Sequence, residues 1–159
     1  NVKRANKLAL QKALSSQKDY QALGVKDPTK VHGMLNAGSE RLLVGVVSRL
    51  VSQKQLDILA KDIEDIYSGN KKTLPIDIVI LGTGEEWLHE RFRVLTNDLR
   101  KLNTGISIAF VEDYSEKLSH MIYAGADVLL IPSDYEPSGL TQMIAMRYGT
   151  LPIVRLTGG

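Results

Sequence analysis

From Arg41 onwards, short aliphatic runs alternate with longer segments that carry a helical apolar stripe, and this alternation constrains the fold more than any other feature. Runs without polar alternation are typical of strands that are covered on both faces. The regular alternation of strands and helices along the chain predicts a parallel sheet with helices on both faces, because each strand–helix–strand crossover is right-handed. The predicted strands are Leu42–Val47, Ile76–Leu81, Gly105–Phe110, Val128–Ile131 and Leu151–Val154.

The segments between these strands have apolar residues at helical spacing. A helix is predicted over Glu112–Ala124 and another over Gly139–Tyr148, with Met143 and Met146 as core residues. We place His89 on the charged side of its helix. The apolar stripes are Leu56, Leu59, Ile63 and Ile66; Leu88, Phe92, Leu95, Leu99 and Leu102; and Leu118, Met121 and Ile122.

The first forty residues are predicted to differ from the rest. Residues 2–14 are predicted to form a helix with Leu8, Ala9 and Ala13 on one face. Residues 15–40 have no hydrophobic period, so they are either a mobile insertion or contain a short element that the pattern does not reveal. We therefore divide the chain into an N-terminal helix with an irregular segment (1–40) and a Rossmann-like domain (41–159).

Composition excludes several classes of function. The 159 residues carry a net charge of only +2, so the electrostatic field of the chain does not indicate a nucleic acid or a membrane surface as partner. The sequence has no cysteine, which excludes disulfides and thiolate catalysis. Its three histidines (His32, His89 and His120) lack ligand spacing, and we predict no metal site. Because the sequence begins at Asn1 and ends on two glycines, we expect it to be a piece of a longer protein.

The predicted strand order is 3-2-1-4-5, counted from Leu42, and it reverses between the first and the fourth strand. Ligands bind at such a reversal, beyond the carboxyl ends of the strands. Arg49 and Lys54 follow the first strand, and Glu136 follows the fourth. A planar guanidinium and a mobile ammonium group suit a diphosphate. The alternative is that both cations are solvated at the surface.

The start of the last predicted helix is a second candidate for ligand binding. Free backbone amides at Ser138, Gly139 and Leu140 would carry the positive end of the helix dipole, where a phosphate or a sugar hydroxyl can dock. Glu136 would accept hydrogen bonds from hydroxyl groups. The alternative is that Ser138 only caps the helix and Glu136 offsets its dipole.

Three weaker signals lie after the other strands. Gly82 and Gly84 could admit a ribose or a base, but a plain tight turn is the simpler explanation. Thr157 and Gly158 suit a phosphate and suit a turn equally well. Tyr114 could stack on a base or be buried. No glycine fingerprint follows the first strand and no acidic residue ends the second, which argues against a nicotinamide-dependent dehydrogenase.

Three stretches of the sequence resemble bacterial glycogen synthases and plant starch synthases: VVSRLVSQKQLDIL, ILGTGEEW and YSEKLSHMIYAGADVLLIPSDYEPSGLTQMIAMRYGTLPIVRLTGG. These enzymes are retaining glucosyltransferases with two Rossmann-like domains, the GT-B architecture. The resemblance covers residues 41–159 and implies most of the C-terminal, nucleotide-sugar-binding domain. It implies that the N-terminal domain, which supplies much of the glucan acceptor site, is absent here. It also implies a location in the bacterial cytoplasm or the plastid stroma.

The resemblance assigns roles to individual residues. Arg49 and Lys54 match the basic pair on the diphosphate of ADP-glucose, and Glu136 matches the glutamate at the donor glucose. It implies ADP-glucose or UDP-glucose as donor, an α-1,4-glucan as acceptor, and no metal, nucleic acid or membrane as partner. The further substrate-binding positions that it implies are Gly82, Gly84, Tyr114, Ser138, Gly139, Leu140, Thr157 and Gly158.

Two departures from related patterns narrow the comparison. Ile144 stands where related families often have a second glutamate, which favours glycogen and starch synthases over sucrose-type transferases. Ser138 stands where this family usually has cysteine, and we expect little change in chemistry. Two alternatives stay open, another nucleotide-sugar-dependent retaining glycosyltransferase and a non-catalytic Rossmann-type binding module. We expect the chain by itself to be inactive.

Overall fold

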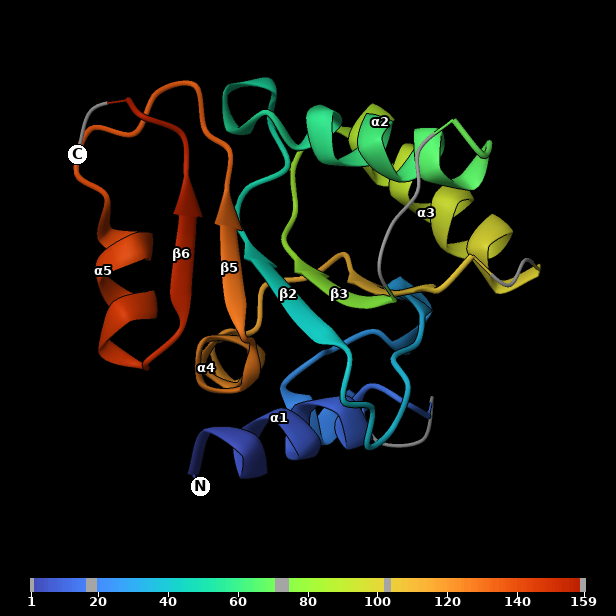
Figure 1. Ribbon diagram of the computed structural model, residues 1–159, viewed down its shortest axis with the longest axis horizontal. Helices are drawn as coiled ribbons and strands as arrows, with labels where there is room; N and C mark the ends of the chain where they lie inside the picture. The colour runs from blue at the N-terminus through green and yellow to red at the C-terminus, as the bar shows by residue number, and fades with distance from the viewer. Residues whose placement is uncertain (1, 17–19, 71–74, 102–103, 158–159) are drawn as a thin grey trace.

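The computed structural model describes residues 2–16, 20–70, 75–101 and 104–157. They form a six-stranded sheet in the order β1-β4-β3-β2-β5-β6 (Figure 1), which confirms the predicted order of five strands and adds a sixth at one edge. All neighbouring pairs are parallel except β1 with β4. The strands are β1 (Val31–Gly33), β2 (Leu42–Val47), β3 (Ile76–Leu81), β4 (Ile106–Val111), β5 (Val128–Ile131) and β6 (Leu151–Val154).

Helices cover both faces of the sheet, as predicted. The side chains of one face, such as Ile78 and Ile80, pack with α2 and α3, and those of the other face, such as Val79 and Leu81, pack with α1 and α4. This division follows from the alternation of side chains along each strand. The helices are α1 (Val2–Ala13), α2 (Leu56–Tyr67), α3 (Glu86–Lys101), α4 (Glu116–Gly125) and α5 (Leu140–Arg147). No described helix is both long and apolar enough to cross a membrane.

Residues 15–40 contain the short element that the pattern did not reveal. β1 is only three residues long and runs antiparallel beside the end of β4, with His32 opposite Phe110. Two single 3-10 turns, Tyr20–Leu23 and Pro28–Lys30, precede it. A three-residue strand has too few positions to show a period of two, so this element could not be read from hydrophobicity alone.

The buried face of α1 differs from the prediction. Leu10 and Gln11 are its buried residues, and Leu8 is exposed. The Gln11 side chain donates to the carboxylate of Asp77 at 3.3 Å and to the Ser39 carbonyl at 2.9 Å. Of the three predicted residues only Ala13 packs against the core, beside the buried Leu10 and Leu14, so the packed face is rotated from the predicted one and includes the polar contact of Gln11.

Two other predicted helix features are corrected. α4 begins at Glu116, because the Ser115 hydroxyl accepts from the Leu118 amide and caps the helix, so Glu112 lies outside it. Met143 and Met146 are exposed (49% and 57%) and are not core residues, since Ala145 is the buried residue of α5. The predicted core residue Leu102 lies outside the described residues.

Candidate functional site

The ends of β2 and β5 lie side by side, as expected for the point where the strand order reverses. Val44 and Gly45 pair with Val128 and Leu129. Beyond the strands, the two following loops are joined by hydrogen bonds although they are far apart in sequence. The Asp134 amide donates to the Gln53 carbonyl at 3.0 Å, and Gln53 Nε2 donates to the Tyr135 carbonyl at 3.0 Å.

Lys54 and Glu136 form an ion pair across this point. Lys54 Nζ lies 2.7 Å from Glu136 Oε2, and the two side chains are only 16% and 15% exposed. The hydrogen bond from Lys54 lowers the pKa of Glu136 below its ordinary value, with smaller contributions from Ser133 and from the charge of Arg49. The structure therefore brings the three predicted charged residues together.

The backbone that presents Lys54 is strained. Lys54 ends a 3-10 turn over Ser52–Lys54, and Gln55 then adopts a left-handed conformation with a φ of 53°. Among the described residues Gln55 is the one non-glycine with a positive φ. Such strain costs on the order of 1 kcal/mol and is common near binding sites.

The start of α5 lies next to this ion pair. Gly139 is the N-cap, with a φ of 65°, and no side chain caps the first turn. Ser138 is exposed and is not the cap, so one alternative for this residue is excluded. The left-handed backbone angle favours glycine at this position, and a Cβ there would also displace the flexible Gln142 side chain, whose Nε2 would lie 2.2 Å away.

A cavity of about 410 Å3 opens beside these loops. Its wall includes Arg49 after β2, Gly82 after β3, Tyr114 after β4 and Thr141 in α5. Tyr114 is 78% exposed, so the expectation of a buried aromatic is wrong and the ring is available to a ligand. A smaller hollow shares Thr141 with the cavity and contains Lys54 and Glu136.

The sequence did not reveal several residues that line the larger cavity. Ser119 and His120 come from α4, and Thr141 and Ile144 come from α5. The His120 ring is 2.7 Å from the hydroxyl of Tyr148 through Nδ1, a contact that joins α4 to the end of α5. These residues lie in the first two turns of helices that follow sheet strands, and this position was the available signal.

Gly82 and Gly84 pack the loop after β3 against the loop that carries Arg49. A Cβ at Gly82 would lie 1.8 Å from the Ser48 carbonyl oxygen, and one at Gly84 would lie 2.0 Å from that of Leu50. Leu50 also donates to the Thr83 carbonyl at 2.9 Å. These contacts give the glycines a role in close backbone approach, as the tight-turn explanation anticipates, and Gly82 in addition lines the cavity.

The segment after β6 is tied to the loop that carries Glu136. Thr157 donates through its hydroxyl to the Asp134 carbonyl at 2.9 Å, and Arg155 pairs with the Asp134 carboxylate at 2.8 Å. The structure thus places Thr157 near the ion pair's loop. Gly158 lies outside the described residues.

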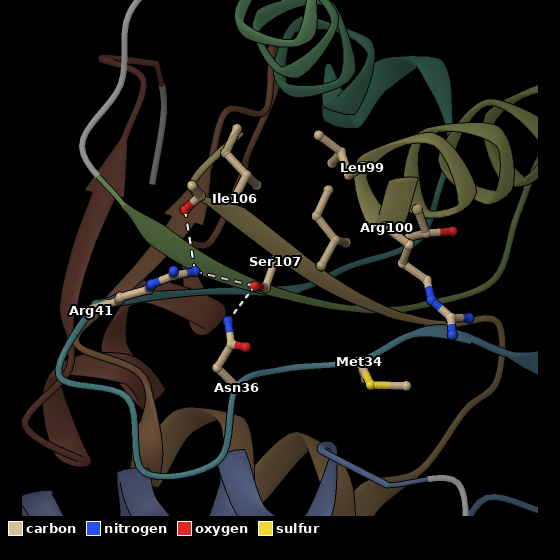
Figure 2. A pocket seen from close by; sticks show the side chains of 10 residues that line it. Met34, Asn36, Arg41, Leu99, Arg100, Ile106 and Ser107 are labelled. Carbon is tan, nitrogen blue, oxygen red and sulfur yellow. Dashed lines mark hydrogen bonds between the residues drawn. The ribbon is translucent and has the colours of Figure 1, made fainter. Parts of the chain in front are cut away.

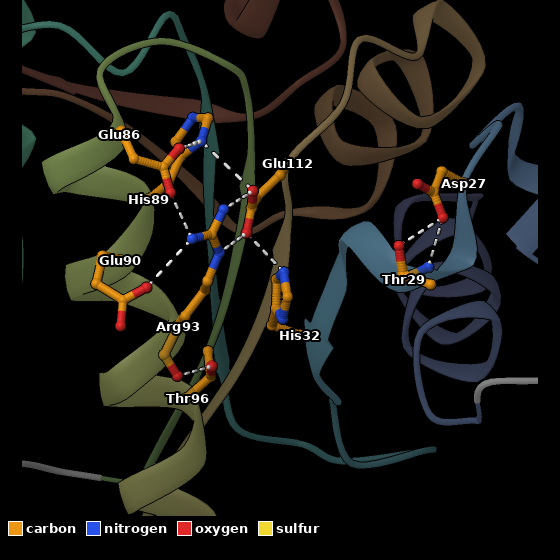
Figure 3. A network of polar contacts seen from close by, with 9 residues as sticks. All are labelled: Asp27, Thr29, His32, Glu86, His89, Glu90, Arg93, Thr96 and Glu112. Carbon is orange, nitrogen blue, oxygen red and sulfur yellow. Dashed lines mark hydrogen bonds and ion pairs between the residues drawn. The ribbon is translucent and has the colours of Figure 1, made fainter.

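A buried charge network supports the end of β4, just before Tyr114 (Figure 3). The guanidinium of Arg93 forms two hydrogen bonds with the Glu112 carboxylate, and His32 Nε2 lies 2.6 Å from it. Burial raises the pKa of Glu112, but Arg93 and then the charge of His32 lower it, and the net shift is downward.

His89 belongs to the same network. Its ring is largely buried, lies 3.4 Å from Glu112 through Nδ1 and packs edge-on against Phe110. His89 therefore lies on the charged side of its helix with Glu86 and Arg93, as predicted, but this part of the charged side is buried. The helical spacing gives no indication that the buried carboxylate of Glu112 lies against His89. Within the described ranges, no group of three or more His, Cys, Asp or Glu side chains is placed to hold a metal ion.

Comparison with known proteins shows the family of this chain. Residues 41–159 match the family described as "Glycosyl transferases group 1". The chain belongs to this family. It is 48% identical over 118 residues to glycogen synthase 1 of Geobacter metallireducens, a match that covers 74% of this chain and 21% of that protein. It is 34% identical over 158 residues to the glycogen synthase of Mycoplasma mobile, covering 99% of this chain and 27% of that protein.

Among solved structures, the catalytic domain of starch synthase IV from Arabidopsis thaliana bound to ADP and acarbose has a similar fold. The TM-score is 0.67 and the sequence identity is 35%, over 99% of this chain and 27% of that chain. The chain therefore spans about a quarter of the length of these glycosyltransferases. This confirms the expected resemblance and the α/β fold of the glycosyltransferase domain.

Proposed function

We propose that this chain is the nucleotide-sugar-binding part of a glucosyltransferase that extends an α-1,4-glucan in glycogen or starch synthesis. The donor is ADP-glucose or UDP-glucose, and glucose is transferred with retention to the non-reducing end of the glucan. The acceptor site depends on a second domain. Within this proposal, residues 41–159 hold the donor without a metal or another cofactor.

The observation that carries the proposal is the meeting of Lys54, Glu136 and Arg49 where the strand order reverses. Lys54 has three N–H donors, and Glu136 takes one of them at 2.7 Å. Lys54 lines the hollow, and Arg49 lines the adjoining cavity. Two cations at this position suit the diphosphate of a nucleotide sugar. The solved relative bound to ADP supports the same ligand class.

The charges suit the bond that must break. As glucose leaves the diphosphate, negative charge grows on the phosphate oxygens and positive character grows on the sugar. Cations held in place before the reaction stabilise that charge as it develops, and such interactions accelerate the chemical step. Glu136 accepts hydrogen bonds from the donor glucose in this scheme, and the uncapped amides at the start of α5 bind its hydroxyls or phosphate.

The cavity accommodates the nucleoside end of the donor. Tyr114 offers an exposed ring for stacking on a base, and Ser119 and Thr141 offer hydroxyl groups on the neighbouring walls. Base–aromatic stacking contributes about 1–3 kcal/mol. The cavity and the hollow at Lys54 and Glu136 share Thr141 as a lining residue, which supports an arrangement with the base in the cavity and the sugar near Glu136.

Calorimetry of the folded chain with ADP tests the proposal. We expect one site with a dissociation constant of about 0.1–1 mM, or roughly −5 kcal/mol, weaker binding of NADH, and no glucan elongation by the chain alone. Lys54→Ala and Arg49→Ala should each weaken ADP about tenfold, the loss of one charge-assisted contact. A folded chain without ADP affinity at several millimolar would contradict the proposal.

A further inference from the structure

A second cavity lies at the opposite end of the sheet, where β4 begins. It has a volume of about 300 Å3 and is bounded by the last turn of α3, the start of β4 and the segment that leads into β2. Figure 2 shows Arg41 and Arg100 on opposite sides, with Asn36 and Ser107 between them. The six residues of β4 span roughly 20 Å, so this cavity is separate from the one lined by Tyr114.

The cavity exists because β1 is shorter than β4. β1 pairs with Ala109, Phe110 and Val111, so in the part of the chain that is described no strand covers the outer edge of residues 106–108. The chain leaves β1 at Met34 and passes along the rim instead. An uncovered stretch of sheet edge offers backbone donors and acceptors as well as side chains.

The charged groups of this cavity are both cationic. Arg41 donates through one nitrogen, Nη1, to Ser107 Oγ at 3.3 Å and to the Gly105 carbonyl at 3.4 Å. Its nearest carboxylate, on the fully buried Asp77, is 3.8 Å away. Arg100 makes no hydrogen bond or ion pair with the described residues. Among the described residues that line the cavity, none is acidic.

Arg100 lies in the last turn of α3, where its positive charge interacts favourably with the helix dipole. This interaction does not occupy the N–H donors of its guanidinium. A guanidinium with free donors matches the paired oxygens of a carboxylate or a phosphate. Between the two arginines, the Asn36 amide donates to the Ser107 hydroxyl and also reaches the Asp77 carboxylate at 3.4 Å. These contacts fix the positions of the Asn36 and Ser107 side chains at the cavity.

We propose that this cavity binds a small organic anion. Arg100 and Arg41 hold its carboxylate or phosphate group, and Asn36 and Ser107 bind its hydroxyl groups. The apolar residues beneath, such as Leu99 and Ile106, exclude water from one side of the ligand. The site is independent of the nucleotide-sugar site, which lies beyond the other end of β4.

An NMR titration of the 159-residue chain with three related compounds tests this site. Glycerol is the neutral probe, glycerate carries a carboxylate and glycerol 3-phosphate carries a phosphate. We expect saturable shifts of the Gly105, Ser107 and Ile108 amides in the millimolar range with one or both anions, and none with glycerol. The stronger of the two anions identifies the preferred group.

Arg100→Gln should weaken the anion about tenfold, as expected for one charge-assisted contact. Arg147→Gln is the matched control, because Arg147 occupies the last turn of α5 and does not line this cavity. The proposal is overturned if Arg100→Gln binds as the unchanged chain does, if glycerol gives the same shifts, or if no anion shifts these amides. A failure of ADP binding would leave this result unaffected.

Discussion

Lys54 Nζ and Glu136 Oε2 lie 2.7 Å apart although the two residues are 82 positions apart in the sequence. The contact joins the loop that follows β2 to the loop that follows β5. A double-mutant cycle with Lys54→Met and Glu136→Gln should give a coupling free energy of about 1–2 kcal/mol, since both side chains are largely buried. Chemical denaturation of the four proteins measures it. A coupling near zero would mean that the pair does not form in solution.

Tyr114→Ala should weaken ADP about tenfold and leave the free energy of unfolding unchanged. The ring is 78% exposed, so it contributes little to the core, but it lines the cavity where a base can stack. Tyr135→Ala is the matched control, because Tyr135 is also exposed and does not line the cavity. Calorimetry with ADP should separate the two variants, and equal affinities would remove Tyr114 from the site.

Gly84→Ala should destabilise the chain by about 2–4 kcal/mol, because the added Cβ would meet the Leu50 carbonyl oxygen at 2.0 Å. Gly38→Ala is the control. Gly38 has a positive φ of 69° with no atom within 4 Å, so it tests backbone strain without a clash. We expect it to cost only about 1 kcal/mol. Thermal unfolding of both variants shows whether the clash between position 84 and Leu50 costs more stability than the backbone strain at position 38.

Arg93→Met should destabilise the chain by about 2–4 kcal/mol, because it leaves the buried carboxylate of Glu112 without its main partner. Adding Glu112→Gln to Arg93→Met should recover much of this loss, since the second change removes the uncompensated charge. If the double variant is no more stable than Arg93→Met, the cost lies in packing rather than in charge.

The stability of the chain should fall in acid. The folded-state pKa values of Glu112 and Glu136 both lie below their ordinary value of 4.5. Each carboxylate therefore contributes stability that is present above about pH 4.5 and is lost as the pH falls through the folded value. Urea unfolding between pH 7 and pH 3 should show this loss. Glu112→Gln should show a smaller loss over the same range, and an identical profile would contradict the assignment.

The sheet could be predicted from the sequence because its signals are local and repeated. Each parallel strand is a continuous aliphatic run, and the apolar stripes of α2 and α3 face the sheet as expected. Right-handed crossovers then limit the possible orders of the strands, and the predicted order is one of the common ones. The positions of Arg49, Lys54 and Glu136 followed from that order, since loops after neighbouring strands must lie together.

The features that escaped prediction depend on contacts between distant residues. Glu112 has the polarity of a helix start, but its carboxylate is buried by Arg93, His32 and His89 from two other elements. The polar anchor of α1, Gln11, has no signature in a hydrophobic pattern. Such pairings are specified by the assembled fold and not by any window of the sequence.

The antiparallel β1 has a practical consequence for anyone who shortens this chain. A variant that begins at Arg41 would keep every residue of the family match yet would uncover the outer edge of β4 along Ala109–Val111. An unprotected edge of this kind recruits strands from other molecules. Truncation at that boundary should therefore yield self-associating material, and expression trials should retain the leading forty residues.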